Sequence, residues 1–251
     1  MILEYHRPET LDQALELLSR DNPRTLPLGG GTVLNSPSSE EYDVVDLQLL
    51  KLNKISKKGN LLQLGATATL QSLYDNTHIP TALADAVHHE AAYNLRHMAT
   101  IAGSLVSADG RSPLSAAFLA LDAQLTILPE NEKIGYGDLL PLRADRLPKR
   151  LITQISIPLQ AKLAYHYVAR SPADLPIVCV ALAQWPSGRT RLSLGGFGYA
   201  PSLAFDGKGV DGLNPGVENA FSHAQDEWAS AEYRLDAAKT LAQRCLKHIA
   251  A

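Results

Sequence analysis

The feature that most limits which folds this chain can adopt is a run of three glycines directly after a short apolar strand. Residues 25–28, Thr-Leu-Pro-Leu, are typical of a buried strand, and Gly-Gly-Gly-Thr follows at 29–32. Glycine permits positive φ and close approach of the backbone to a ligand because it has no Cβ. Amide hydrogens in such a turn form a concave nest suited to phosphate, to which Thr32 adds a hydroxyl. A tight turn without a ligand is equally compatible with these residues.

The segments around this turn predict a small β-α-β unit. Apolar residues recur at helical spacing over residues 11–18, and Thr10 is suited to the N-cap of that helix. Asn22-Pro23 ends the helix, and residues 44–47 are typical of a second buried strand. The first 50 or so residues therefore place the glycine turn at the C-terminal end of a strand.

A second glycine-containing segment spans residues 100–110, Thr-Ile-Ala-Gly-Ser-Leu-Val-Ser-Ala-Asp-Gly. We expect it to lie just before a helix, where backbone amides, Thr100 and Ser104 meet further phosphate oxygens. The alternative is a packed turn of small residues. Neither glycine segment has the spacing of the dinucleotide fingerprint, and the Gly-Lys-Ser/Thr of a Walker loop does not occur.

The rest of the chain predicts a mixed lobe followed by a different C-terminal part. In the mixed lobe we expect a strand pair within 55–70, helices at 70–74, 82–95 and 114–121, and strands at 124–128 and 151–157. Beyond it we expect antiparallel strands at 165–168, 177–184 and 191–195, a loop at 204–215, and helices at 218–224 and 232–250. The boundary is expected near residues 158–163.

Composition narrows the function classes. The chain has 251 residues, 45% of them hydrophobic, and a net charge of -3, which excludes disorder as the main state and gives no reason to expect nucleic acid as a partner. No apolar run approaches the roughly 20 residues of a membrane span, and residues 1–8 predict no signal peptide. Only Cys179 and Cys245 occur, so this chain alone carries no disulfide framework and no all-cysteine iron–sulfur or zinc site. A reducing, cytoplasmic setting fits best.

Two polar clusters are interpreted as surface features. His88, His89 and Glu90 are adjacent on a predicted helix and face different directions, so we expect a surface helix there, with no metal site in this chain. Lysines at 51, 54, 57 and 58 predict a solvated hairpin edge, with docking to a partner as the alternative.

Both glycine segments, with their flanks, resemble the FAD-binding medium subunit of molybdenum hydroxylases, the family of carbon monoxide dehydrogenase and xanthine dehydrogenase. The first flavin loop of that family is close to Ala-Gly-Gly-Thr-Asp-Leu, which corresponds to residues 29–34 here. The second is close to Thr-Ile-Gly-Gly-Asn/Ser-Leu, which corresponds to residues 100–105. The resemblance continues through Leu-Ala-Leu-Asp-Ala at 119–123, residues 168–178 and Tyr233-Arg234, so it spans nearly the whole chain in order.

The resemblance implies an α+β fold. A two-lobed FAD-binding domain of the p-cresol methylhydroxylase type is expected over residues 1–158, with lobes of roughly 1–54 and 55–158. A C-terminal domain, a small antiparallel sheet with helices, is expected over 159–251. FAD is expected between the lobes, bound by Gly29, Gly30, Gly31, Thr32, Val33, Leu34, Thr100, Ala102, Gly103, Ser104 and Asp109. No catalytic acid–base residue is expected in this chain.

The sequence departs from the family pattern at four positions. Val33 stands where the family usually has Asp, and Ala102 replaces the first glycine of the second loop. Pro113 stands at the position of an Asp, and Tyr167 at that of a common Lys. Backbone-amide contacts to FAD would survive these changes. Tyr165 and Tyr167 alternate on a predicted strand, so they face either the flavin ring or the core of the sheet.

The implied function is that of a flavoprotein subunit in an oxidoreductase complex. Its expected partners are a molybdopterin-binding large subunit and a [2Fe–2S] small subunit, and electrons leave through FAD to NAD, a quinone or another acceptor. One alternative is a flavin-free scaffold subunit with the same fold. Another is a stand-alone flavin reductase similar to UDP-N-acetylenolpyruvoylglucosamine reductase, whose glycine turn is echoed by residues 29–32 with Asn35.

Overall fold

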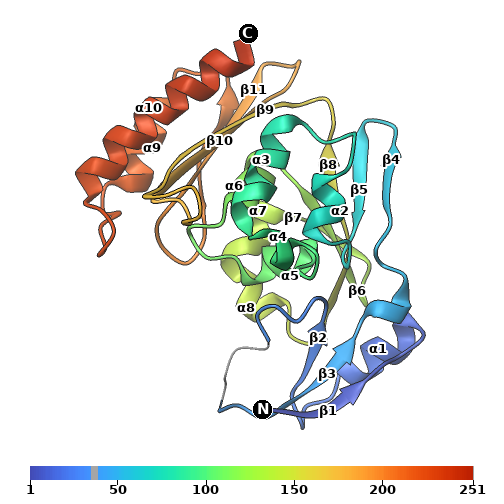
Figure 1. The fold of residues 1–251 in the computed structure, drawn as a ribbon. Coiled ribbons are helices and arrows are strands. Elements are labelled where there is room, and N and C mark those ends of the chain that lie inside the picture. The colour runs from blue at the N-terminus through green and yellow to red at the C-terminus, as the bar shows by residue number, and fades with distance from the viewer. Residues whose placement is uncertain (35–38, 251) are drawn as a thin grey trace.

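The computed structural model describes residues 1–34 and 39–250, in which three sheets follow one another from the N-terminal to the C-terminal end (Figure 1). The first sheet is parallel, with order β1-β3-β2, and contains β1 (Ile2–His6), β2 (Thr25–Leu28) and β3 (Tyr42–Asp46). Helix α1 (Leu11–Leu18) makes the crossover from β1 to β2, so the expected β-α-β unit is confirmed. Asn35, on which the reductase alternative draws, lies outside the described residues.

Helix α1 forms where its cap and its apolar spacing predict. The Thr10 hydroxyl accepts a hydrogen bond from the Gln13 amide, and the Gln13 side chain accepts one from the Thr10 amide, which completes a capping box. Ala14 and Leu18 are buried on the inner face of the helix and pack in one cluster with Val45 of β3. This small cluster holds the helix on the first sheet.

The second sheet has five antiparallel strands in the order β4-β5-β8-β6-β7. Its strands are β4 (Ile55–Lys58), β5 (Leu61–Gly65), β6 (Gln124–Leu128), β7 (Glu132–Gly135) and β8 (Leu151–Pro158). Between β5 and β6 the chain forms α2 (Leu70–Tyr74), α3 (Thr81–Glu90), α4 (Tyr93–Arg96), α5 (Ile101–Ser107) and α6 (Pro113–Ala120). All eight residues of α6 are buried, because this helix lies between α3 and the third sheet.

The third sheet is an antiparallel meander of β9 (Lys162–Val168), β10 (Val178–Gln184), β11 (Arg189–Gly195) and β12 (Ser202–Lys208). Alternate residues of β10 belong to two different cores. Cys179, Ala181 and Ala183 pack in the core that contains α6, whereas Val178, Val180 and Leu182 face α9 (Leu213–Phe221) and α10 (Ala231–Ala250). The two-residue period of a strand thus joins the middle of the molecule to the C-terminal helices (Figure 1).

Three predictions of secondary structure are wrong. Residues 100–110, expected as a segment just before a helix, themselves contain α5. The single helix expected at 82–95 is split into α3 and α4, because Ala91 is extended (φ -153°, ψ 148°) and its carbonyl accepts from the Arg96 guanidinium at 3.0 Å. The loop expected at 204–215 contains most of β12 and the start of α9. Asp206, which suggested a loop, lies on β12 and pairs with Arg189 and Arg191 of β11.

The segment between β7 and β8 contains structure that the sequence did not predict. It forms α7 (Tyr136–Leu139), the 3-10 turn η2 (Leu140–Leu142) and α8 (Arg143–Arg146), while a further 3-10 turn, η1 (Gln48–Leu50), follows β3. Within residues 1–34 and 39–250, no helix combines the length and apolar character needed to cross a membrane.

Candidate functional site

The two glycine segments, about 70 residues apart in the sequence, lie directly against each other. A Cβ on Gly30 would lie 1.7 Å from the Met98 carbonyl oxygen, and a Cβ on Gly29 would lie 2.7 Å from Thr100 Oγ1. Of the three glycines only Gly31 has a positive φ, 70°. Gly29 and Gly30 are therefore needed for the close approach of the two segments and Gly31 for the turn.

A cavity of about 680 Å³ opens where these segments meet, between the first sheet and the lobe of the second sheet. Its volume is typical of a small-molecule or cofactor site. The lining includes these predicted FAD-binding residues: Gly29, Gly30, Gly31, Thr32, Val33, Leu34, Thr100, Ala102 and Gly103. Ser104 and Asp109 are outside the lining, and Asp109 is exposed, with Oδ1 accepting from the Arg111 amide at 2.8 Å.

The backbone amides of the two segments differ in what they bind. Within the described part of the chain, no acceptor meets the amides of residues 30–32. Free amides on a turn that lines a cavity are the arrangement that binds phosphate.

In the second segment, Thr100 is the N-cap of α5. The Ile101 amide donates to Ala68 O at 2.8 Å, the Ala102 amide to Ala66 O at 3.2 Å, and the Gly103 amide to Thr100 Oγ1 at 3.2 Å. The prediction that this segment presents its amides to a ligand is wrong for these three, because packing and capping use them.

Basic side chains that the motifs did not reveal surround the cavity. Its lining contains one acidic residue, Asp21, and these basic residues: Arg20, Arg24, Arg143, Lys149 and Arg150. Arg24 pairs with Glu40 at 3.2 Å, and Lys149 pairs with Asp21. Arg20 and Arg143 have no carboxylate partner among the described residues. The cavity is therefore suited to an anion although the whole chain carries a net charge of -3.

Arg143, the first residue of α8, joins three parts of the chain at the cavity. Its Nη2 donates to the carbonyl oxygens of Ala108 at 2.5 Å and Tyr199 at 3.1 Å. Its Nη1 is buried and has no hydrogen-bond partner among the described residues. The two carbonyl contacts of Nη2 therefore hold the positive charge of Arg143 at the wall of the cavity.

The four departures from the family pattern lie in different environments. Val33 and Ala102 line the cavity, and the Val33 side chain is 54% exposed. Pro113 is buried as the first residue of α6, a position that proline favours because no helical hydrogen bond is lost there. Tyr167 packs against the His89 ring, with centroids 4.1 Å apart, and stacks on Tyr165. Tyr165 is buried in the core that contains α6.

The His88-His89-Glu90 stretch ends helix α3 at the surface, with His88 exposed and His89 and Glu90 half-buried. His89 Nδ1 contacts the Asp85 carbonyl oxygen at 2.7 Å, and the Glu90 carboxylate accepts from Ser112 Oγ and from the Leu114 amide at the start of α6. Burial raises the pKa of Glu90 to about 7, although both hydrogen bonds act to lower it. Glu90 therefore fixes the end of α3 to the start of α6.

The raised pKa of Glu90 predicts a pH-dependent stability. Because the pKa of Glu90 is about 7 in the folded protein and near 4.5 in the unfolded chain, folding favours the protonated carboxyl group. This contribution to the free energy of unfolding is full below about pH 4.5 and is lost as the pH rises to about 7. Replacement of Glu90 by Gln should reduce the loss of unfolding free energy between about pH 5 and about pH 8. Chemical denaturation at both pH values measures it, with Asp85→Asn on the same helix as control. Equal pH slopes in wild type and Glu90→Gln would contradict the assignment.

Comparison with known proteins identifies the family. Residues 1–160 match the family described as the FAD binding domain in molybdopterin dehydrogenase. The protein YgfM of Escherichia coli (strain K12) is 30% identical over 240 residues, which cover 93% of this chain and 91% of YgfM. The glyceraldehyde dehydrogenase medium chain of Sulfolobus acidocaldarius is 26% identical in an alignment of 276 positions, which covers 98% of each chain.

Solved structures have the same fold. A chain of quinoline 2-oxidoreductase from Pseudomonas putida 86 superposes with a TM-score of 0.82 at 22% identity, covering 100% of this chain and 97% of that one. A chain of reconstituted CO dehydrogenase from Oligotropha carboxidovorans superposes with a TM-score of 0.81 at 22% identity, covering 98% of this chain and 97% of that one.

These matches confirm the resemblance, the α+β fold, the oxidoreductase class and FAD as the cofactor. The chain therefore belongs to the FAD-binding domain family of the molybdopterin dehydrogenases and is a FAD-binding subunit of the molybdenum hydroxylase type.

Proposed function

We propose that this chain is the electron-exit subunit of a molybdenum-dependent dehydrogenase complex. In this proposal a large subunit with molybdopterin oxidises the substrate, a small subunit passes the electrons through [2Fe–2S] clusters, and this chain delivers them to an external acceptor such as NAD or a quinone. The observation that carries the proposal is the cavity at which both glycine segments meet, with unpaired amides and basic side chains in its lining. The proposed division of the chain near residue 158 follows the end of β8, after which the third sheet begins.

The lining of the cavity fits the parts of FAD. We assign the pyrophosphate to the amides of residues 30–32, which lack acceptors within the described chain, and to the charges of Arg20 and Arg143, which lack carboxylate partners there. Val33, Leu34, Val106 and Leu147 supply apolar surface in the same lining. Thr100, Ala102 and Gly103 form the opposite wall, with Ser104 and Asp109 as neighbours outside it. When bound, FAD accepts and releases electrons, and this chain positions it and shields it from water.

The need for partners follows from the cysteines of the chain. Cys179 and Cys245 are both buried, and burial raises the pKa of each thiol. Neither thiol is therefore suited to redox chemistry or to holding a cluster. In this proposal the electrons that reach FAD come from another chain, in agreement with the medium chain named in the Sulfolobus relative.

The relay is tested by purifying a tagged chain from the cells that make it. We expect molybdenum and iron to co-purify with FAD and the flavin absorbance of the complex to bleach on reaction with a substrate of its large subunit. The isolated chain loaded with FAD should not bleach with that substrate. A chain that purifies alone with FAD and is reduced directly by NADPH or NADH at enzymatic rates would contradict the relay and favour the stand-alone reductase.

A further inference from the structure

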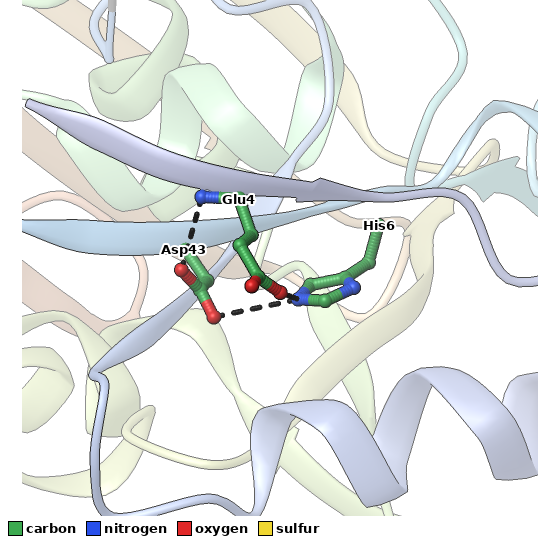
Figure 2. Close-up of side chains that lie close together, drawn as sticks. All are labelled: Glu4, His6 and Asp43. Atoms are coloured by element: carbon green, nitrogen blue, oxygen red, sulfur yellow. Dashed lines mark hydrogen bonds and ion pairs between the residues drawn. The ribbon is translucent and has the colours of Figure 1, made fainter.

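Three side chains of metal-binding type converge on the first sheet, outside the cavity that we assign to FAD. Glu4 and His6 are two residues apart on β1 and so lie on the same face of that strand, and Asp43 comes from the neighbouring strand β3 (Figure 2). His6 Nε2 lies 3.4 Å from Glu4 Oε2 and 3.4 Å from Asp43 Oδ2. One ligand atom from each side chain lies within 4.8 Å of the other two.

The strand pairing holds Asp43 in this position. The register between β1 and β3 is irregular between Ile2 and Tyr5, and there the Glu4 amide donates to Asp43 Oδ1 at 3.1 Å in place of a backbone acceptor. An irregularity of this kind re-aims a side chain at a chosen point. Asp43 Oδ2 is left to face His6 and Glu4, as Figure 2 shows.

The charge of Asp43 is not balanced by the described protein. Asp43 is 1% exposed, and its Oδ2 contacts only His6 Nε2, at a distance longer than a normal hydrogen bond. No Lys or Arg of the described residues pairs with Asp43 or Glu4. Asp46, equally buried on the same strand, is balanced, since it pairs with Arg7 at 3.4 Å and accepts from Tyr5 Oη and the Gln48 amide. Burying a carboxylate charge without such a partner costs free energy of folding. A cation between the three side chains would balance the charge.

Two of the three distances between the ligand atoms agree with a small divalent ion, and the third is no more than 4.8 Å. A tetrahedral ion with bonds of about 2.1 Å has ligand atoms about 3.4 Å apart, which is the distance from His6 Nε2 to each carboxylate. One imidazole and two carboxylates suit Zn²⁺ among the ions of this size. We propose that Glu4, His6 and Asp43 bind a zinc ion, with water as the fourth ligand on the exposed side of Glu4.

A zinc ion at this position would fasten the N-terminal edge of the sheet. β1 is an edge strand, and its first four residues are exposed, so few apolar contacts hold it to β3. The ion would join two ligands of β1 to one of β3. This role is structural and does not depend on the function proposed for the cavity, whose lining contains none of the three residues.

The test is a zinc titration of the full chain after treatment with a chelator, by calorimetry and by thermal unfolding. We expect about one Zn²⁺ per chain and a rise in the unfolding midpoint. His6→Ala and Asp43→Asn should each weaken zinc binding by at least about 10- to 100-fold. Replacing a residue that only hydrogen-bonds to a metal ligand already weakens binding by that amount. Asn at 43 keeps an oxygen for the Glu4 amide. His78→Ala, a change at an exposed histidine elsewhere, is the control and should bind as wild type does.

Two results would overturn the zinc site. One is binding that is absent or equally strong in wild type and in both ligand variants. The other is an ion pair alone, in which His6→Ala lowers the stability of the fold while Zn²⁺ has no effect on it at any pH. Retention of FAD by the variants shows that they are folded.

Discussion

Replacing Gly30 with alanine is expected to abolish retention of FAD by the chain and to lower its unfolding free energy by about 1–3 kcal/mol. The added Cβ would lie 1.7 Å from the Met98 carbonyl oxygen and 2.5 Å from the Met98 carbonyl carbon. These are backbone atoms, so no change of rotamer relieves the overlap, and the two glycine segments must move apart. Both segments line the cavity, which therefore loses its shape.

Gly137→Ala is the matched control for this prediction. Its added Cβ would meet the end of the Leu119 side chain at 3.1 Å, a contact that a small side-chain movement relieves, and Gly137 is outside the cavity lining. Gel filtration after incubation with FAD, together with urea denaturation, measures both variants. If Gly30→Ala retains FAD as the control does, the packing of the two segments is not what shapes the site.

The largest loss of stability is expected at Arg234, a residue near the start of α10 whose side chain is fully buried. Its guanidinium is held by one carboxylate and three backbone carbonyl oxygens: Asp226 Oδ1 at 2.7 Å, Ala224 at 2.8 Å, Ala229 at 3.1 Å and Ile177 at 3.2 Å. Arg234→Ala leaves the buried carbonyl oxygens of Ala224 and Ile177 without this donor, whereas Asp226 keeps the amides of Trp228 and Ala229. At roughly 1–3 kcal/mol for each unpaired buried acceptor, we expect a loss of about 2–6 kcal/mol, which chemical denaturation measures.

Lys239→Ala on the same helix is the control for Arg234. Lys239 pairs with Glu218, but both side chains are exposed, so its removal should cost less than about 1 kcal/mol. Similar losses for the two variants would mean that the buried guanidinium does not hold the turn before α10 in place.

Local signals in the sequence predicted much of the fold. Thr10 and Gln13 mark the start of α1 through a capping box that needs only residues near each other in the chain. The glycine run predicted a close approach of the backbone to a ligand, and in the structure Gly29 and Gly30 approach Thr100 and the Met98 carbonyl. Such features are predictable because each one depends on a few neighbouring residues.

Features that depend on distant residues were missed. β12 is rich in residues typical of loops, and it forms because Asp206 meets Arg189 and Arg191 across the strand pair. Arg20 and Arg143 line one cavity from segments more than 100 residues apart, without a motif that links them. The second glycine segment lines the cavity, but two of its amides are used by contacts with residues 66–68 that spacing alone does not reveal.

The cavity between the glycine segments is assigned to FAD. The most direct test of this assignment is the FAD affinity of the chain, measured by titration and by the flavin absorbance that co-elutes in gel filtration, for wild type, Arg20→Glu and Lys58→Glu. Arg20 lines the cavity, whereas Lys58 lies on the exposed hairpin of β4 and β5 and undergoes the same change of charge. We predict about one FAD per wild-type chain, the same affinity in Lys58→Glu, and weaker binding in Arg20→Glu. A wild-type chain that elutes without flavin, or equal affinity in the two variants, would contradict the assignment.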